Sequence, residues 1–173
     1  MSEGKYRTTD WIMQFDVDVE EPWPTTHDWD ALARTAVTAL LNVAPELDNP
    51  RLVTSLLFTS DEEIHALNRE WRDRDKPTNV LSFPMMERVE LLALDSKGPP
   101  AMLGDIAVAH ETCAREAAEK GVSVEHHVTH LLIHGLLHLA GYDHEISEKD
   151  AEKMEALEVK ALALLDISNP YEG

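Results

Sequence analysis

The run HGLLHLAGYDH, residues 134–144, constrains the fold more than any other part of this 173-residue chain. His134 and His138 are four positions apart, and on a helix such side chains lie on one face with about 5 to 6 Å between Cβ atoms. Gly141 follows, and a glycine there can take the left-handed conformation that ends a helix. The chain then turns back and can return His144 to the same point. The run therefore predicts a helix, a glycine turn and three converging imidazoles.

Three histidine nitrogens are suited to a divalent transition metal. Zn²⁺ held by three protein ligands keeps a fourth, open position, which is the arrangement of catalytic rather than structural zinc sites. We therefore expect one zinc ion bound by His134, His138 and His144. Three imidazoles also suit nickel, copper or iron, so these metals are alternatives.

Two further histidines on the same helix offer a competing register. His130, His134 and His138 are spaced four apart, and His127 lies on nearly the same face. His130 and His138 would be about 12 Å apart along the helix axis, too far to share an ion when each metal–nitrogen bond is about 2.1 Å. We expect His130 and His127 either to lie behind the metal ligands or to be packing residues, with His130 nearer to the site.

Gly135 and the single cysteine, Cys113, limit the reactions and metal sites that this chain can support. In zinc peptidases with an HExxH motif, the glutamate after the first histidine is the general base, and here that position is Gly135. A peptidase or amidase that uses the same three-histidine zinc would need its base from elsewhere, and it is retained as an alternative. Cys113 is the only cysteine, which excludes an intrachain disulfide and a thiolate zinc cluster. We expect Cys113 to be a small buried residue.

A basic cluster stands out in a chain with 33 acidic and 15 basic side chains and a formal net charge of -18. It consists of Arg69, Arg72, Arg74 and Lys76. Such residues can simply complement the dipole at a helix end, and this reading stays open for Arg74 and Lys76. A planar guanidinium can instead hold a phosphate by two hydrogen bonds. The turn signal of Asp75, Pro77 and Thr78 predicts that the loop is fixed.

Three sequence blocks resemble the YbeY family of bacterial metal-dependent endoribonucleases. They are HGLLHLAGYDH, the block LNREWRDRDKPTNVLSFP at residues 67–84, and the weaker match LGDIAVA at residues 103–109. The resemblance implies cleavage of single-stranded RNA in ribosomal RNA processing, including maturation of the small-subunit 3′ end, and in ribosome quality control. It implies that Arg72 is catalytic or binds RNA, and that His134 is catalytic as well as a metal ligand. Asp105 in the third block becomes a candidate for a residue behind the metal or beside the substrate.

The resemblance also implies partners. These are ribosomal RNA and the ribosomal particle, with ribosomal proteins or an assembly GTPase as further candidates, and neither DNA nor a membrane. The acidic excess repels a polyanion, so we expect slow cleavage of naked RNA and faster cleavage on a ribosomal particle.

Asp143 could orient an imidazole, act as a base or only form the turn. A non-catalytic assembly factor, in which the metal braces the turn, is a further alternative.

Length and periodicity predict a single α+β domain over residues 1–173, a mixed α/β sandwich of about four strands with about five helices. The absence of a long apolar run and the polar N-terminus predict a cytoplasmic protein. Strands are expected at residues 11–19, 51–59, 79–83 and 103–109, with a flexible stretch around Gly98, Pro99 and Pro100. Helices are expected after Asp28, Ser60, Ser123 and Ser147, and over residues 110–120, which Gly121 ends.

Overall fold

The computed structural model describes residues 13–142 and 147–172. In these ranges four strands form one sheet in the order β1-β2-β4-β3. Strand β1 is parallel to β2 and β2 is parallel to β4, whereas β3 is antiparallel to β4 and lies at an edge. The bounds are Gln14–Val19 for β1, Leu52–Thr59 for β2, Val80–Pro84 for β3 and Ala101–Ala109 for β4.

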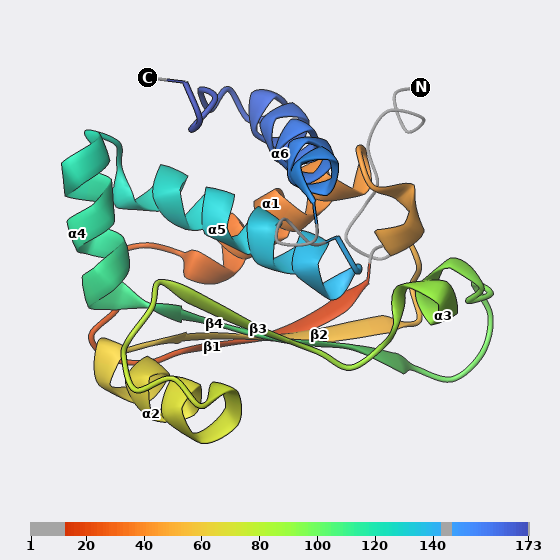
Figure 1. Cartoon of the computed structure of the whole chain (residues 1–173), viewed down its shortest axis with the longest axis horizontal. Coiled ribbons are helices and arrows are strands. Elements are labelled where there is room, and N and C mark those ends of the chain that lie inside the picture. Colours follow the sequence, from red (N-terminus) through yellow and green to blue (C-terminus); the bar gives the residue numbers. More distant parts are fainter. Residues whose placement is uncertain (1–12, 143–146, 173) are drawn as a thin grey trace.

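The described ranges contain six α-helices around this sheet, one more than expected (Figure 1). Helices α1 and α5 cover one face with α6 above them, and α2 lies on the opposite face. The predicted α+β class is therefore confirmed. The helices are α1 Trp29–Leu41, α2 Asp61–Arg72, α3 Arg88–Leu92, α4 His110–Lys120, α5 Val124–Leu139 and α6 Glu148–Ala163, with the 3₁₀-helix η3 at Pro45–Leu47.

The predicted helix starts are confirmed by side-chain caps. The side chain of Ser60 accepts a hydrogen bond from the backbone N–H of Glu63, and Asp28, Ser123 and Ser147 cap α1, α5 and α6 in the same way. These contacts satisfy N–H groups that have no partner within the helix. Gly121 ends α4 with a φ of 70°, also as predicted.

The expectation of a flexible stretch between the third and fourth strands was wrong in part. Helix α3 forms there, and β4 begins at Ala101 instead of Leu103. Arg51 donates to the carbonyl oxygens of Pro99 and Asp95 at 2.9 and 3.1 Å. These non-local hydrogen bonds give the stretch a fixed path, which local Gly and Pro signals do not reveal.

The main core lies between the sheet and helices α1, α5 and α6. Apolar side chains of α5 are buried in it, and Cys113 is buried as predicted. A packed helix holds its side chains in fixed rotamers, so this core positions the histidines of α5. No helix within the two described ranges is long and apolar enough to cross a lipid bilayer.

Candidate active site

The predicted glycine turn at the end of α5 is present. Gly141 has a φ of 97°, and its N–H donates to the carbonyl of His138 at 3.0 Å. The N–H of Tyr142 donates to the carbonyl of Leu137 at 3.0 Å, which completes a Schellman turn. A Cβ at position 141 would lie 2.5 Å from Cβ of Arg88, so the site needs glycine for space as well as for φ.

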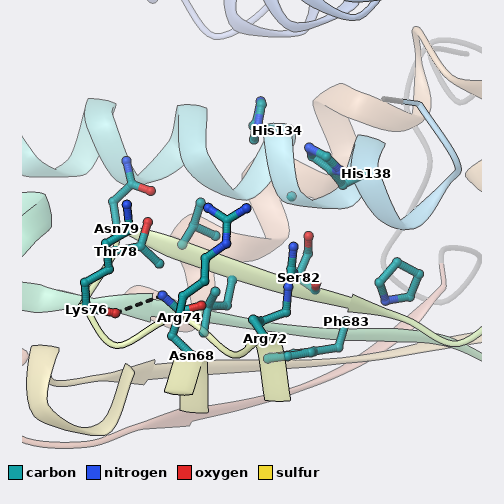
Figure 2. A pocket seen from close by; sticks show the side chains of 14 residues that line it. Asn68, Arg72, Arg74, Lys76, Thr78, Asn79, Ser82, Phe83, His134 and His138 are labelled. Atoms are coloured by element: carbon teal, nitrogen blue, oxygen red, sulfur yellow. Dashed lines mark hydrogen bonds between the residues drawn. The ribbon is translucent and has the colours of Figure 1, made fainter. Parts of the chain in front are cut away.

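His134 and His138 line one pocket of about 670 Å³ at the edge of the sheet (Figure 2). Their ring centroids are 5.0 Å apart. The third predicted ligand, His144, and the neighbouring Asp143 lie outside the described residues. Within the described ranges, no three His, Cys, Asp or Glu side chains are grouped so that they could hold a metal ion. The structure thus places two of the three predicted ligands together.

The opposite wall of this pocket is basic. It is formed by the end of α2, the loop that follows it and the edge strand β3 (Figure 2). Arg72, the last residue of α2, donates from Nη1 to the carbonyl of Ser82 at 3.3 Å. Arg74 and Lys76 line the same pocket. The fold therefore brings the two sequence blocks around Arg72 and His134 to one cavity.

The basic loop is held by Asn68, a buried side chain that sequence analysis did not single out. Its Nδ2 donates to the carbonyl of Lys76 at 2.8 Å, and its own carbonyl accepts from the N–H of Arg74 at 3.1 Å. Asp75 pairs with His65 at 2.6 Å, and this hydrogen bond holds the pKa of Asp75 below its ordinary value. The loop is therefore fixed, as the turn signal predicted.

Glu158 of α6 is the main functional candidate that sequence analysis missed. Its side chain is 1% exposed, and Oε2 lies 2.8 Å from Nδ1 of His134. Oε1 lies 2.7 Å from Nε2 of His130 and accepts a short hydrogen bond from the hydroxyl of Tyr171. The available signal was an acid in the middle of an apolar stripe, four residues from both Met154 and Leu162.

Opposing effects set the charge of this cluster. Burial alone would raise the pKa of Glu158, but hydrogen bonds from His130, His134 and Tyr171 lower it to about 2. Burial and the hydrogen bond to Glu158 raise the pKa of Tyr171. At neutral pH Glu158 is therefore a carboxylate that only accepts, and Tyr171 is a hydroxyl that donates.

The remaining predicted residues lie elsewhere. His130 forms a hydrogen bond with the carboxylate of Glu158, and this carboxylate links it indirectly to His134. His127 is buried and pairs with Glu116 of α4 at 2.8 Å. Asp105 lies outside the residues that line the pocket. It shares its face of β4 with Ala107, which packs toward α2, whereas Ile106 contacts Gly135 of α5.

The fold and pocket place the chain among small α+β proteins in which a core helix carries a histidine pair opposite a basic loop. The model of the family described as Endoribonuclease YbeY matches residues 18–166. The chain belongs to this family.

Similar proteins agree. A protein of Erythrobacter litoralis named Endoribonuclease YbeY is 59% identical, covering 92% of this chain and 98% of that protein. One of the same name from Novosphingobium aromaticivorans is 56% identical, covering 90% and 94%. A solution structure of a Thermotoga maritima protein is 25% identical with a TM-score of 0.55, covering 92% of this chain and all of that one.

Proposed function

We propose that this chain is a zinc-dependent endoribonuclease that cleaves phosphodiester bonds in single-stranded RNA. The observation that carries the proposal is one pocket lined both by the histidine pair of α5 and by the basic loop after α2. Family membership supports the substrate class. We place its action in the cytoplasm, in ribosomal RNA processing, including small-subunit 3′-end maturation, and in ribosome quality control.

The histidine pair fits a metal ion. With metal–nitrogen bonds of about 2.1 Å, the ring centroids of two imidazoles on one tetrahedral ion are roughly 5 Å apart. The centroids of His134 and His138 are 5.0 Å apart. His134 also has a carboxylate behind its ring, as metal-binding histidines usually have. His134, His138 and His144 would hold the ion.

A bound zinc ion would supply Lewis-acid activation of a phosphoryl oxygen or of water. The protein supplies positioning and charge. Arg72 would contact the scissile phosphate and stabilise the negative charge that develops on it, because a guanidinium can donate two parallel hydrogen bonds. Arg74 and Lys76 would bind neighbouring phosphates along the edge strand, where they line the pocket.

The test combines metal analysis of the purified protein with cleavage of a single-stranded RNA. Wild type should contain about one zinc ion and cut the RNA. His134→Ala should lose metal and activity together. His126→Ala is the matched control, since His126 lies on the same helix but is exposed and lines a different pocket. Full RNA cleavage by a metal-free wild type would contradict the proposal.

A further inference from the structure

A buried cluster joins the C-terminal part of the chain to the pocket. Glu158 belongs to α6 and Tyr171 to the segment after it, whereas His130 and His134 belong to α5. Oε2 of Glu158 accepts a hydrogen bond from His134, and Oε1 accepts hydrogen bonds from His130 and Tyr171. The carboxylate is thus fully buried with donors on both oxygens, which is what a desolvated charge requires.

The direction of these hydrogen bonds fixes the protons of the two rings. A carboxylate can only accept, so Nδ1 of His134 must donate, and in the neutral ring the lone pair is then on Nε2. His130 likewise donates from Nε2. Its Nδ1 is buried without a hydrogen-bond partner among the described residues.

We infer that Glu158, held in place by Tyr171, is a positioning residue that fixes the Nδ1–H tautomer of His134 and thereby makes Nε2 the metal-binding nitrogen. The inference rests on the proposed metal site. A carboxylate behind a ligand histidine sets the orientation of the ring and raises its basicity. The segment around Tyr171 follows the last helix, so a residue close to the C-terminus contributes to a site formed by the middle of the chain.

The two positioning residues should have graded effects. Glu158→Gln has one acceptor oxygen, so its amide must point an N–H group at His134 or at His130, and one ring must change tautomer. Zinc affinity should fall about 10- to 100-fold, the usual range for such a partner. Tyr171→Phe removes one donor and leaves the carboxylate, so zinc affinity should fall about 2- to 10-fold, the net effect of one hydrogen bond.

Two measurements on the full chain test this. Zinc affinity is measured by competition with a chromophoric chelator, and the tautomer of His134 is read from imidazole nitrogen shifts in the metal-free protein. Glu116→Gln is the matched control, since Glu116 accepts from His127 of the same helix at 2.8 Å without touching His134. This control should keep wild-type zinc affinity and the Nδ1–H tautomer of His134.

The inference is overturned if folded Glu158→Gln keeps both the tautomer and the zinc affinity of wild type. If Glu158→Gln does not fold, Tyr171→Phe decides, and unchanged zinc affinity in that variant overturns the inference. Failure of the proposed function has a different signature. A wild type that binds zinc through the Nε2 atom of His134 but cuts no RNA would refute the nuclease proposal and leave the positioning role supported.

Discussion

Arg88 of the short helix α3 donates from Nη1 to the carbonyl oxygen of Ala140 at 2.8 Å, directly before the glycine turn. The same guanidinium pairs with Glu46 at 3.0 Å and lies 4.3 Å from the ring centroid of Tyr142. The hydroxyl of Tyr142 in turn donates to Glu46 at 2.7 Å. Two segments far from α5 in sequence, around Glu46 and Arg88, therefore hold the end of this helix and the turn that follows it.

Replacing Arg88 should destabilise the fold through this cluster. Arg88→Ala should lower the free energy of unfolding by about 2 kcal/mol, because hydrogen bonds to charged groups contribute about that much. Urea unfolding measures it. Arg34→Ala is the control, since Arg34 makes an exposed ion pair with Asp30 within α1 and should cost less than about 1 kcal/mol. Equal losses in the two variants would contradict the bracing role of Arg88.

The same cluster should make stability depend on pH. Burial alone would raise the pKa of Glu46, but hydrogen bonds from Tyr142 and Arg88 hold it below its ordinary value of 4.5. A carboxyl with a lowered pKa adds stability above the unfolded value, and this is lost as pH falls through the folded value. The stability difference between wild type and Glu46→Gln should therefore be constant from pH 7 to about 5 and shrink below about 4.5. A difference that is constant down to pH 2 would refute this.

Local signals could predict much of the fold. Ser60, Ser123 and Ser147 each cap a helix, and Gly121 and Gly141 each end one, because capping needs only neighbours in sequence. The spacing of His134 and His138 likewise placed both on one helix face. These features depend on residues within one or two turns of each other, so the sequence alone suffices to predict them.

Non-local pairs could not be predicted in this way. Glu158 and Arg88 act through partners in other elements, and their partners become apparent only once α6 and α3 are packed. Asp105 shows the opposite problem, since a strand position does not reveal which face of the sheet it occupies. The sequence resemblance selected Asp105, which lies on the α2 side of β4 and outside the residues that line the pocket.

Gly104 of β4 lets the edge strand β3 and helix α5 approach β4 closely. It follows a register shift in β4 and has a φ of 152°. A Cβ there would lie 2.5 Å from the carbonyl oxygen of Phe83 and 2.7 Å from Cδ2 of Leu139. Gly104→Ala should therefore cost about 2 to 4 kcal/mol from backbone strain and overpacking, and should reduce RNA cleavage by displacing β3 from α5.

Gly121→Ala provides the comparison for this substitution. Gly121 also has a positive φ, of 70°, but nothing lies within 4 Å of an added Cβ. Its cost should be only the backbone term of about 1 to 2 kcal/mol, with RNA cleavage unchanged. Thermal or urea unfolding of both variants separates the two terms. If Gly104→Ala is no less stable than Gly121→Ala, the close approach of β3 and α5 to β4 adds no cost to the substitution, and this prediction is wrong.

The acidic excess should make the substrate context matter. The formal net charge is -18, and the basic residues of the pocket are a local exception. Free RNA is repelled at long range, so its cleavage should be slow, whereas a ribosomal particle can hold its RNA near the pocket through protein contacts. We expect faster cleavage of the same RNA segment within the particle at physiological salt. Equal rates on naked RNA and on the particle would refute this.

Arg72 provides the sharpest separation of metal binding from catalysis. It lines the pocket opposite His134 but comes from α2, so its replacement should leave the zinc content unchanged. Arg72→Glu should lower the rate of RNA cleavage by about 100-fold or more, the effect of losing one donor to a developing charge. Arg72→Lys should recover only part, because an ammonium cannot donate the two parallel hydrogen bonds of a guanidinium.

Arg115→Glu is the control for charge alone. Arg115 is exposed on α4 and lies outside the residues that line the pocket, and its replacement changes the net charge by the same amount. If Arg115→Glu slows cleavage as much as Arg72→Glu, the effect comes from long-range repulsion and the assigned role of Arg72 is wrong. If only Arg72→Glu is inactive while it still binds zinc, catalysis needs a positive charge at this one position. That position lies in the pocket wall opposite His134 and His138.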